Sequence, residues 1–418
     1  MTSTQPPEFL PVRRQADRQE PLGAPVLLDA LDLDRGRWLL VLEDVSGLLS
    51  STVVEDGEGF RRARVGDGVA EELLAGTATE DERRAFTFRR LGTIGPWGGE
   101  QPIDVDQSNE SIVVGGKAVV KRFVWTALGN ERPMVLPPHL MATGFDEMPA
   151  PLGNAGWRCA DGVAPLASIT SYLPGARDGW DWYVELLERS LEDRSVDAIE
   201  PAAALGAVAA RLHRALSTPT DILPAPSAVA GEETVARWRR NAEADLDAAI
   251  SSIDGDEGSR LRERAVAVRD ELVELRSSET ISIPIHGHLH VGQFLQWHGG
   301  LAVSDLDGDP LDPGTLAGSP AKDVASLVQS LDHVGRIVER RRGRSVAGWI
   351  RDASDACLGA YRRELAALGA SVLFDERLLR PLRVAQELHE FVYADRYLRP
   401  SWLYVPDRAL AALLDGAS

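Results

Sequence analysis

One short stretch of the chain, residues 285–310, carries most of the side chains that could do chemistry. An apolar segment at 281–285 leads into His286-Gly287-His288-Leu289-His290, and Gln293 follows. A second apolar segment, 301–303, ends at three closely spaced carboxylates, Asp305, Asp307 and Asp309. Polar groups that directly follow two short strands of a hairpin can place a proton acceptor beside a metal ion. The pattern favours phosphoryl transfer, in which a base and Mg²⁺ act next to the terminal phosphate.

Parts of this stretch are also compatible with other metals. Three histidines in five residues could bind zinc, but the remaining ligands of a closed tetrahedral site are not spaced for it. The aspartates at 305, 307 and 309 resemble the start of a calcium loop. Pro310 and the missing terminal glutamate argue against an EF-hand. Carboxylate and amide oxygens suit Mg²⁺ better than zinc.

The first part of the chain is expected to be rich in strands. Runs at 38–43, 51–55, 60–65 and 85–91 have strand composition with glycines between them, and a short helix is expected within 69–95. The clearest hairpin covers 103–125, with Gly115-Gly116 as a two-residue turn of the primed type. On its return strand, Lys121 is expected to point inward on the same face as Val119 and Phe123. Another strand is expected at 167–172.

The second part is expected to be helical, because apolar residues recur there at helical spacing. A short helix is also expected at 137–145, before that part. Helices are predicted at 180–191, 201–217, 233–253, 257–277, 321–340, 345–369, 375–398 and 407–415. The strands around 281–303 interrupt this run. The fold class predicted from the order of elements is α+β.

Composition excludes several function classes. The 418 residues carry a net charge of −19, which argues against a nucleic-acid partner because phosphate contacts need a basic surface. No membrane span and no signal peptide are expected, and residues 1–24 should be disordered or extended. Two cysteines fit a reducing cytoplasm. The oligomeric state stays open.

Several separate segments together resemble one known family. They are residues 107–111 (Gln-Ser-Asn-Glu-Ser), Lys121, 173–180, Leu212-His213, the loops 286–293 and 304–310, 319–325 and 399–403. In order and spacing they resemble the protein-kinase-like phosphotransferases of the aminoglycoside-phosphotransferase type. Among these, the maltokinase-like sugar kinases of actinobacteria, with their glucosamine kinase branch, are the most similar.

The resemblance implies a bilobal fold with ATP and Mg²⁺ as cofactors. It implies a cap subdomain at 25–95, a β-rich N-lobe at 96–178 with a hinge near 169–175, and an α-helical C-lobe at 179–418. The catalytic loop would be 286–293 and the metal loop 304–310.

The resemblance also implies roles for residues around the nucleotide. Ser108, Asn109 and Ser111 would cover the phosphates, and Lys121 would pair with the α- and β-phosphates. Protein kinases orient such a lysine with a helical glutamate, whereas the nearby Glu131 lies in a segment that does not look helical. Backbone groups of the hinge, including Ser171 and Leu173, would read adenine.

The catalytic loop departs from the family pattern. His288 stands where the family has the aspartate that acts as base, and a neutral imidazole is a competent general base. Asp307 is the second candidate. Gln293 and Asp305 match the family's metal ligands. His213 is expected to be a core histidine, and Asp323 to anchor the catalytic loop.

The sugar site is expected to use residues near the C-terminus together with His290. Aromatic and acidic side chains concentrate there, as a polar sugar pocket requires: Glu387, Glu390, Tyr393, Trp402 and Tyr404. Residues 180–183 are compatible with either core packing or a wall of that site. The carboxylates favour glucosamine over maltose or an aminoglycoside, and a catalytically inactive nucleotide-binding pseudokinase is the alternative from another class.

Overall fold

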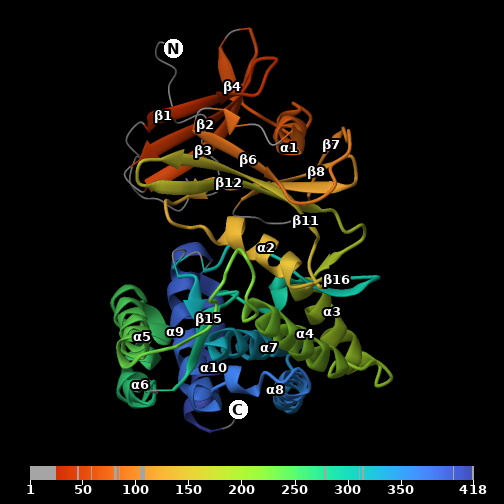
Figure 1. The fold of residues 1–418 in the computed structure, drawn as a ribbon. Coiled ribbons are helices and arrows are strands. Elements are labelled where there is room, and N and C mark those ends of the chain that lie inside the picture. Colours follow the sequence, from red (N-terminus) through yellow and green to blue (C-terminus); the bar gives the residue numbers. More distant parts are fainter. Residues whose placement is uncertain are drawn as a thin grey trace. The chain divides into compact units, whose positions relative to one another are not determined.

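The computed structural model describes residues 25–44, 47–57, 59–79, 82–83, 85–103, 109–276, 279–309, 311–312, 315–398 and 400–416 (Figure 1). The chain divides into two compact units. Unit 1 comprises Met1–Met141 and Pro149–Pro174, and unit 2 comprises Ala142–Met148 and Gly175–Ser418. The described part of unit 1 is rich in strands and that of unit 2 in helices, which confirms the α+β prediction.

Two antiparallel sheets and two helices make up the described part of unit 1. The first sheet has the order β1-β2-β3-β10, with β4 paired to β3, and the second has the order β5-β6-β11-β12-β9-β8-β7. The elements are β1 (Val26–Asp32), β2 (Arg37–Asp44), β3 (Gly47–Glu55), β4 (Phe60–Arg62), α1 (Val69–Thr79), β5 (Glu82–Arg83), β6 (Phe86–Arg90), β7 (Glu100–Pro102), β8 (Glu110–Val114), β9 (Ala118–Arg122), β10 (Trp125–Thr126), α2 (Arg132–Ala142), β11 (Pro151–Cys159) and β12 (Gly162–Ser171).

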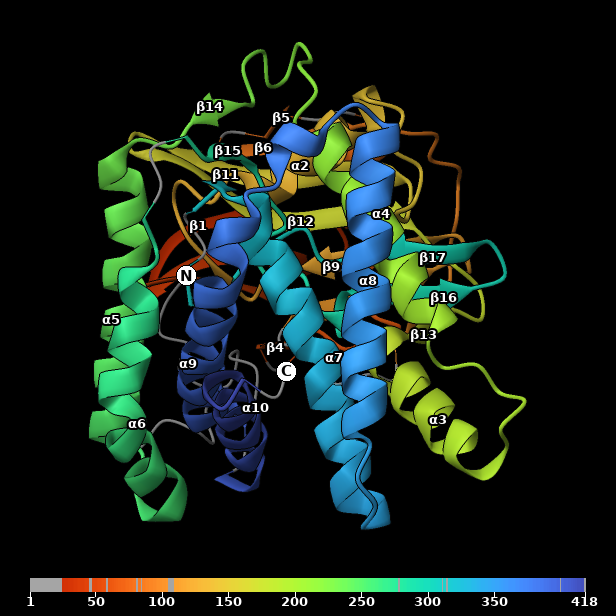
Figure 2. The same cartoon turned by 90° about the horizontal axis from the view of Figure 1, so that it is seen from below.

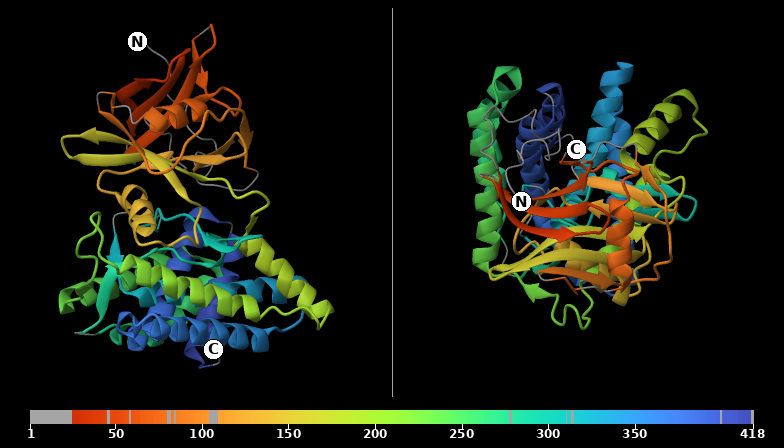
Figure 3. Two further views of the ribbon diagram at one scale, coloured as in Figure 1. Left: turned by 45° about the vertical axis from the view of Figure 1, so that its right-hand side comes forward. Right: turned by 90° about the horizontal axis from the view of Figure 1, so that it is seen from above.

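One apolar core joins both sheets and α1. Figure 3 shows the ribbon from two further directions. Leu39 and Val41 come from the first sheet, Leu73 from α1, and Phe86 and Val120 from the second. Alternating residues supply this core from β2 (Leu39 and Val41) and β6 (Phe86 and Phe88), as expected for half-buried strands. The predicted boundary between cap and N-lobe, at residue 95, falls inside unit 1, and that subdivision stays a prediction.

The hairpin β8–β9 has the predicted turn. Gly115 and Gly116 both have a φ of +61°, which the primed turn requires, and Lys117 donates its N–H to the carbonyl of Val114 over 3.1 Å. The Lys121 Nζ lies 5.7 Å from the centroid of the Phe123 ring, so these side chains share a face as predicted.

The sequence prediction missed β11 entirely. Its glycines made the segment look like a loop, since glycine weakens strands. At Gly153 a Cβ atom would come within 2.2 Å of a side-chain carbon of Thr77 and 2.6 Å of the Arg89 carbonyl oxygen. Glycine is therefore needed for the close approach of β11 to α1 and β6.

The helix predicted at 137–145 was misplaced, because α2 spans Arg132–Ala142. Pro137 and Pro138, which usually end helices, lie inside it. Buried Leu136 and Leu140 hold the helix against the core. Glu131 therefore immediately precedes a helix, contrary to the expectation of a non-helical segment.

Helices dominate the described part of unit 2 (Figure 2). The elements are β13 (Arg177–Asp178), α3 (Gly179–Glu192), α4 (Glu200–Leu216), β14 (Ala228–Val229), α5 (Glu232–Ser252), α6 (Gly255–Val273), β15 (Ile281–Pro284), η3 (Val291–Gln293), β16 (Phe294–Trp297), β17 (Gly300–Val303), β18 (Ala317–Gly318), α7 (Pro320–Arg342), α8 (Ala347–Ala367), η4 (Ser371–Leu373), η5 (Glu376–Leu378), α9 (Leu379–Tyr397), η6 (Pro400–Trp402) and α10 (Tyr404–Leu414).

The central helix of unit 2 is α7. It is buried along most of its length and contacts α3, α4, α8, α9 and α10. Ser319 caps its first turn by accepting the N–H of Ala321, Pro320 occupies the first helical position, and Gly343 ends it in a left-handed conformation. The helix thus gives the residues along it fixed positions. No helix in the described ranges is long and apolar enough to cross a membrane.

Candidate active site

A buried carboxylate holds the start of the catalytic loop. Asp323, in the first turn of α7, accepts the backbone N–H of His286 over 2.7 Å and that of Gly287 over 2.8 Å. It also lies 3.1 Å from the Nε2 of His213, whose Nδ1 is 2.8 Å from the Tyr361 hydroxyl. Burial alone would raise the pKa of Asp323, but His213 and these N–H groups hold it below its ordinary value. The predicted anchoring role of Asp323 and core role of His213 are confirmed.

A short hairpin brings the two predicted metal ligands to one end. Gln293 directly precedes β16, and Asp305 is the second residue after β17. The two strands pair antiparallel from Phe294 and Val303 onward. Ser304 donates its N–H to the carbonyl of Gln293 over 2.8 Å, which ties the two loops together. Asp305 is exposed and has a φ of +59°, a conformation uncommon for residues other than glycine. The backbone at Asp305 is therefore strained, directly after the residue that bonds to Gln293.

His288 lies in a group of rings from two elements. Its centroid is 4.6 Å from that of His290, 6.0 Å from that of Tyr393 and 6.5 Å from that of His389. His290 accepts the N–H of Gly292 on Nδ1, and its Nε2 lies 3.2 Å from the Gln293 amide nitrogen. The predicted base His288 therefore lies close to the predicted metal ligand Gln293 in unit 2. Two predicted sugar contacts, His290 and Tyr393, lie in the same group.

Burial keeps these two histidines neutral. It lowers the pKa of His288, with Asp309 opposing the shift and His389 adding to it. Burial, together with His288 and His286, lowers the pKa of His290 well below its ordinary value. A neutral imidazole can accept a proton, so His288 has the protonation state that a base requires at neutral pH.

Past the hairpin, the metal loop is fixed by a charged histidine that the sequence prediction did not identify. His389 on α9 lies with Nε2 3.4 Å from Asp309 and with Nδ1 3.7 Å from Asp245. Burial opposes protonation, but these carboxylates raise the pKa of His389 to about 10. Burial would raise the pKa of Asp309, yet His389 and Lys322 hold it well below its ordinary value. The loop end is therefore fixed by opposite charges.

An aromatic pair lies beside the turn η3. The rings of Trp180 on α3 and Trp402 are 6.2 Å apart. A side chain at Gly292 would meet both the His290 ring and the Cβ of Trp180. The Trp180–Trp402 pair is therefore placed to form one wall of a site next to the catalytic loop.

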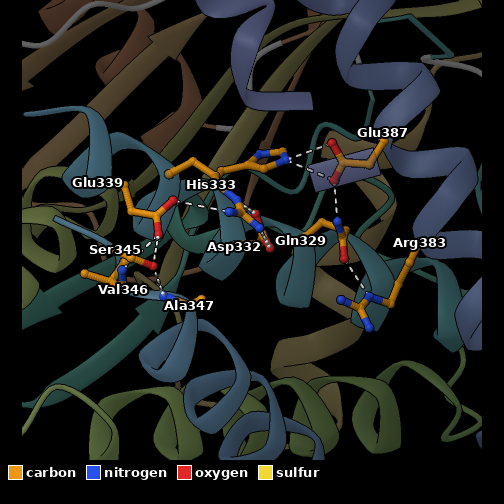
Figure 4. A network of polar contacts seen from close by, with 10 residues as sticks. Gln329, Asp332, His333, Glu339, Ser345, Val346, Ala347, Arg383 and Glu387 are labelled. Carbon is orange, nitrogen blue, oxygen red and sulfur yellow. Dashed lines mark hydrogen bonds and ion pairs between the residues drawn. The ribbon is translucent and has the colours of Figure 1, made fainter. Parts of the chain in front are cut away.

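Two of the predicted sugar contacts lie in other surroundings. Glu387 is fully buried, and its carboxylate meets the His333 ring at 3.0 and 3.1 Å and the Gln329 amide (Figure 4). The Tyr404 ring packs over the Arg340 guanidinium at 4.1 Å. A buried carboxylate with its oxygens already bonded does not support a sugar contact for Glu387. Glu390, three residues further along α9, is half-buried and acts electrostatically on His288.

The predicted nucleotide contacts of unit 1 are partly described. Ser111 on β8 pairs with Lys121 on β9, so their side chains lie on the same face, and Asn109 directly precedes β8. Ser108 lies outside the described residues. The N–H of Ser171 bonds to the Ala150 carbonyl and its hydroxyl accepts the Ala150 N–H, each over 2.8 Å. The backbone N–H of Ser171 is therefore already used. A backbone contact between the hinge and adenine stays a prediction for Leu173.

Sequence reasoning left His389, Asp309 and Lys322 without a role. One local signal existed for His389, because it precedes Tyr393 by four residues and so shares a helix face with it. No local pattern connects Asp245, Asp309 and Lys322, which come from three separate segments.

Comparison with known proteins identifies close relatives. No protein-family model matches the chain. A glucosamine kinase from Streptacidiphilus jiangxiensis is 42% identical over 410 residues, covering 93% of this chain and 92% of that protein. A crystal structure of a glucosamine kinase superposes with a TM-score of 0.81 at 38% identity, covering 99% of this chain and 98% of the other. A second, a glucosamine kinase in complex with glucosamine, ADP and inorganic phosphate, has a TM-score of 0.77 at 37% identity, covering 99% and 100%. The chain therefore belongs to the glucosamine kinase family.

Proposed function

We propose that this protein uses ATP to phosphorylate the 6-hydroxyl of D-glucosamine, giving glucosamine 6-phosphate. The observation that carries the proposal is the 37% identity, over 99% of the chain, to a glucosamine kinase in complex with glucosamine, ADP and inorganic phosphate. The arrangement in unit 2 supports it, because the candidate base His288 and the candidate metal ligand Gln293 both contact His290, and Asp305 acts electrostatically on His288. The reaction is an in-line transfer without a covalent enzyme intermediate.

We propose that Gln293 and Asp305 hold Mg²⁺. Mg²⁺ favours hard oxygen ligands and usually takes only one or two protein carboxylates, with substrate phosphates and water completing its shell. The Gln293 amide and the Asp305 carboxylate, at one end of the β16–β17 hairpin, would supply the protein's part of such a shell. In the described ranges, no group of three or more His, Cys, Asp or Glu side chains is arranged to hold a metal ion. When bound, Mg²⁺ neutralises charge on the phosphates.

We propose that His288 accepts the proton of the attacking hydroxyl, with Asp307 as the second candidate. The neutral ring of His288 packs between His290 and Tyr393, which fix its orientation. Phosphoryl transfer depends more on positioning than on a strong base, so an imidazole is sufficient. In unit 1, Asn109, Ser111 and Lys121 are proposed to contact the phosphates.

For the sugar, we propose contacts with Glu390, Tyr393 and the Trp180–Trp402 pair. Apolar faces of a sugar ring pack against aromatic rings, and the ammonium of glucosamine favours a carboxylate such as Glu390. A location in the cytoplasm is proposed from the two cysteines, which are both free.

The test is ADP release with ATP and Mg²⁺ against glucosamine, glucose, N-acetylglucosamine, maltose and kanamycin. We expect turnover with glucosamine and little with N-acetylglucosamine, because acetylation removes the ammonium. A ³¹P–¹H correlation spectrum of the product should place phosphorus on C6. Turnover with maltose or kanamycin alone would replace the glucosamine assignment, and ATP binding without turnover of any sugar would identify a pseudokinase.

The metal assignment has its own variant. Asp305→Asn should abolish turnover while leaving the thermal melt nearly unchanged, because the side chain is exposed. Asp352→Asn, which changes an exposed carboxylate on α8, is the matched control and should keep full activity. Full activity of Asp305→Asn would remove Asp305 from the reaction.

A further inference from the structure

A single carboxylate, that of Glu100, accepts backbone N–H groups around the start of α1. Its Oε2 accepts the N–H groups of Gly66 over 2.7 Å and of Gly68 over 3.1 Å. Its Oε1 accepts those of Ala70 over 2.7 Å and of Glu71 over 3.3 Å. The first turn of a helix has N–H groups without helical partners and carries partial positive charge, so a carboxylate is favourable there. Because Glu100 comes from β7, these bonds also join two separate elements.

The segment that donates the N–H groups is held by contacts of its own. Gly66 and Gly68 have φ values of +95° and +81°, which glycine adopts without strain. Between them, Asp67 accepts two bonds from the Arg61 guanidinium, over 2.7 and 2.8 Å. Arg37 donates to the carbonyls of Asp67 and Gly68 over 3.4 and 3.3 Å. We therefore expect these N–H groups to keep their directions when the Glu100 side chain is removed.

A further bond between α1 and this strand runs in the opposite direction (Figure 1). Glu71, in the first turn of α1, accepts the N–H of Gly99 over 2.6 Å. The carbonyl of Gly99 in turn accepts the N–H of Gly115, in the turn between β8 and β9, over 2.9 Å. Because Gly99 directly precedes Glu100, the start of α1 is bonded to the start of β7 through both residues.

The strand β7 lies at the edge of the second sheet, and among the described residues it pairs only with β8. It has three residues, so its own ladder of hydrogen bonds is short. Its last residue, Pro102, pairs with Ile112 of β8. The residue before Ile112 is Ser111, which pairs with Lys121 on β9 and shares a face with it. The bonds to α1 therefore fix an edge strand that lies next to two proposed phosphate contacts.

We propose that Glu100 is a positioning residue for the phosphates of ATP. By holding β7 on the start of α1, it fixes β8 and thereby Ser111 and Lys121. Glu71 assists through its bond to Gly99. The proposal rests on the proposed kinase function. All these residues belong to unit 1, whereas the proposed sugar contacts belong to unit 2, so the effect should fall on ATP alone.

The first test is Glu100→Ala. We expect the KM for ATP to rise about tenfold and the KM for glucosamine to stay within about twofold of wild type. The affinity for ATP without sugar, measured by isothermal titration calorimetry, should fall by the same factor. Asp29→Ala is the matched control, because Asp29 also joins two elements of unit 1 by accepting the Trp157 Nε1–H over 2.9 Å. It should leave both KM values unchanged.

The second test is chemical rescue of Glu100→Ala. Alanine keeps the Cβ atom, so the atoms that are lost correspond to one acetate ion. Acetate at up to about 100 mM should restore the KM for ATP, because the N–H groups still point at the vacated position. Acetamide, which has the same shape without the charge, should not restore it. Chloride salts keep the ionic strength constant, and the wild type should not respond to acetate.

Four results would overturn the proposal. They are a KM for ATP within about twofold of wild type in folded Glu100→Ala, an equal rise in Asp29→Ala, no restoration by acetate, or equal restoration by acetamide. If Glu100→Ala fails to fold, as judged by its thermal melt, Glu71→Ala replaces it. That variant removes the bond to Gly99 and should raise the KM for ATP by a smaller factor, and an unchanged KM would overturn the proposal.

Failure of the proposed function gives a different result. If the wild type phosphorylates no sugar, the proposed function is wrong. The ratio of ATP affinities between Glu100→Ala and the wild type, measured without sugar, still tests the role of Glu100.

Discussion

Two buried histidine–carboxylate pairs lie along α7 and differ in what the carboxylate holds. At the start of the helix, Asp323 pairs with His213 and also accepts two backbone N–H groups of the catalytic loop. Ten residues further on, His333 pairs with Glu387 of α9, whose other contact is the side chain of Gln329 (Figure 4). All four side chains are buried. The first pair therefore positions the loop that we propose to be catalytic, whereas the second joins two helices.

The largest effect is expected from Asp323→Asn. The amide can accept only one of the two backbone N–H groups, and its own NH₂ then opposes the other, so the catalytic loop shifts. We expect kcat to fall about 100-fold and the free energy of unfolding to fall by about 4 kcal/mol, because a buried pair is broken. Initial rates below the melting temperature, together with urea unfolding, measure both. A kcat within a few-fold of wild type would show that the loop does not depend on this carboxylate.

The matched change at the second pair is Glu387→Gln. It should lower the free energy of unfolding by a similar amount, about 4 kcal/mol. It should leave kcat and the KM for glucosamine nearly unchanged, because the Glu387 carboxylate is fully buried and bonded to Gln329 and His333. Steady-state kinetics of the folded variant provide the check. A large rise in KM would instead restore Glu387 as a sugar contact.

The contribution of the His333–Glu387 pair to the free energy of unfolding should depend on pH. Burial opposes protonation of His333, but Glu387 raises its pKa from 6.5 to about 9. A raised histidine pKa gives stability that is fully present below about pH 6.5 and is lost as the pH rises through about 9. The difference in free energy of unfolding between wild type and Glu387→Gln should therefore narrow by about 3 kcal/mol over this range. A difference that stays constant from pH 6.5 to 10 would mean that His333 is not charged in the folded state.

The smallest effect is expected from Tyr361→Phe, at the residue that contacts His213 of the first pair. It removes the hydroxyl that meets His213 over 2.8 Å while leaving the ring in place. The free energy of unfolding should fall by about 1 kcal/mol. Turnover should change less than threefold, because the Asp323 contacts to the loop remain. A loss of activity comparable to that of Asp323→Asn would extend the positioning network to Tyr361.

The comparison along α7 also shows what local sequence can reveal. Helical periodicity predicted α7, and Asp323, in a segment that resembles the family, was predicted to anchor the catalytic loop. The same periodicity placed Glu387 and Glu390 near each other on α9 but could not show that one faces His333 and the other the catalytic loop. That distinction depends on how α9 packs against α7, which is set by contacts distant in sequence.

The misses in unit 1 have similar physical causes. The strand β11 was missed because its glycines serve close packing against α1 and β6 and so erase the local strand signal. The start of α2 was missed because tertiary packing of Leu136 and Leu140 outweighs the effect of its prolines. The Gly115-Gly116 hairpin was predicted correctly because a primed turn is specified by its own two residues.

The alternation of faces along β9 limits how this protein can change during evolution. Loss or gain of one residue between the turn and Lys121 would exchange the faces of Lys121 and Arg122. It would carry a lysine toward α1 and a guanidinium to the proposed phosphate face in a single event. The β8–β9 hairpin can therefore accept substitutions at many positions, but only length changes of two residues keep both faces intact.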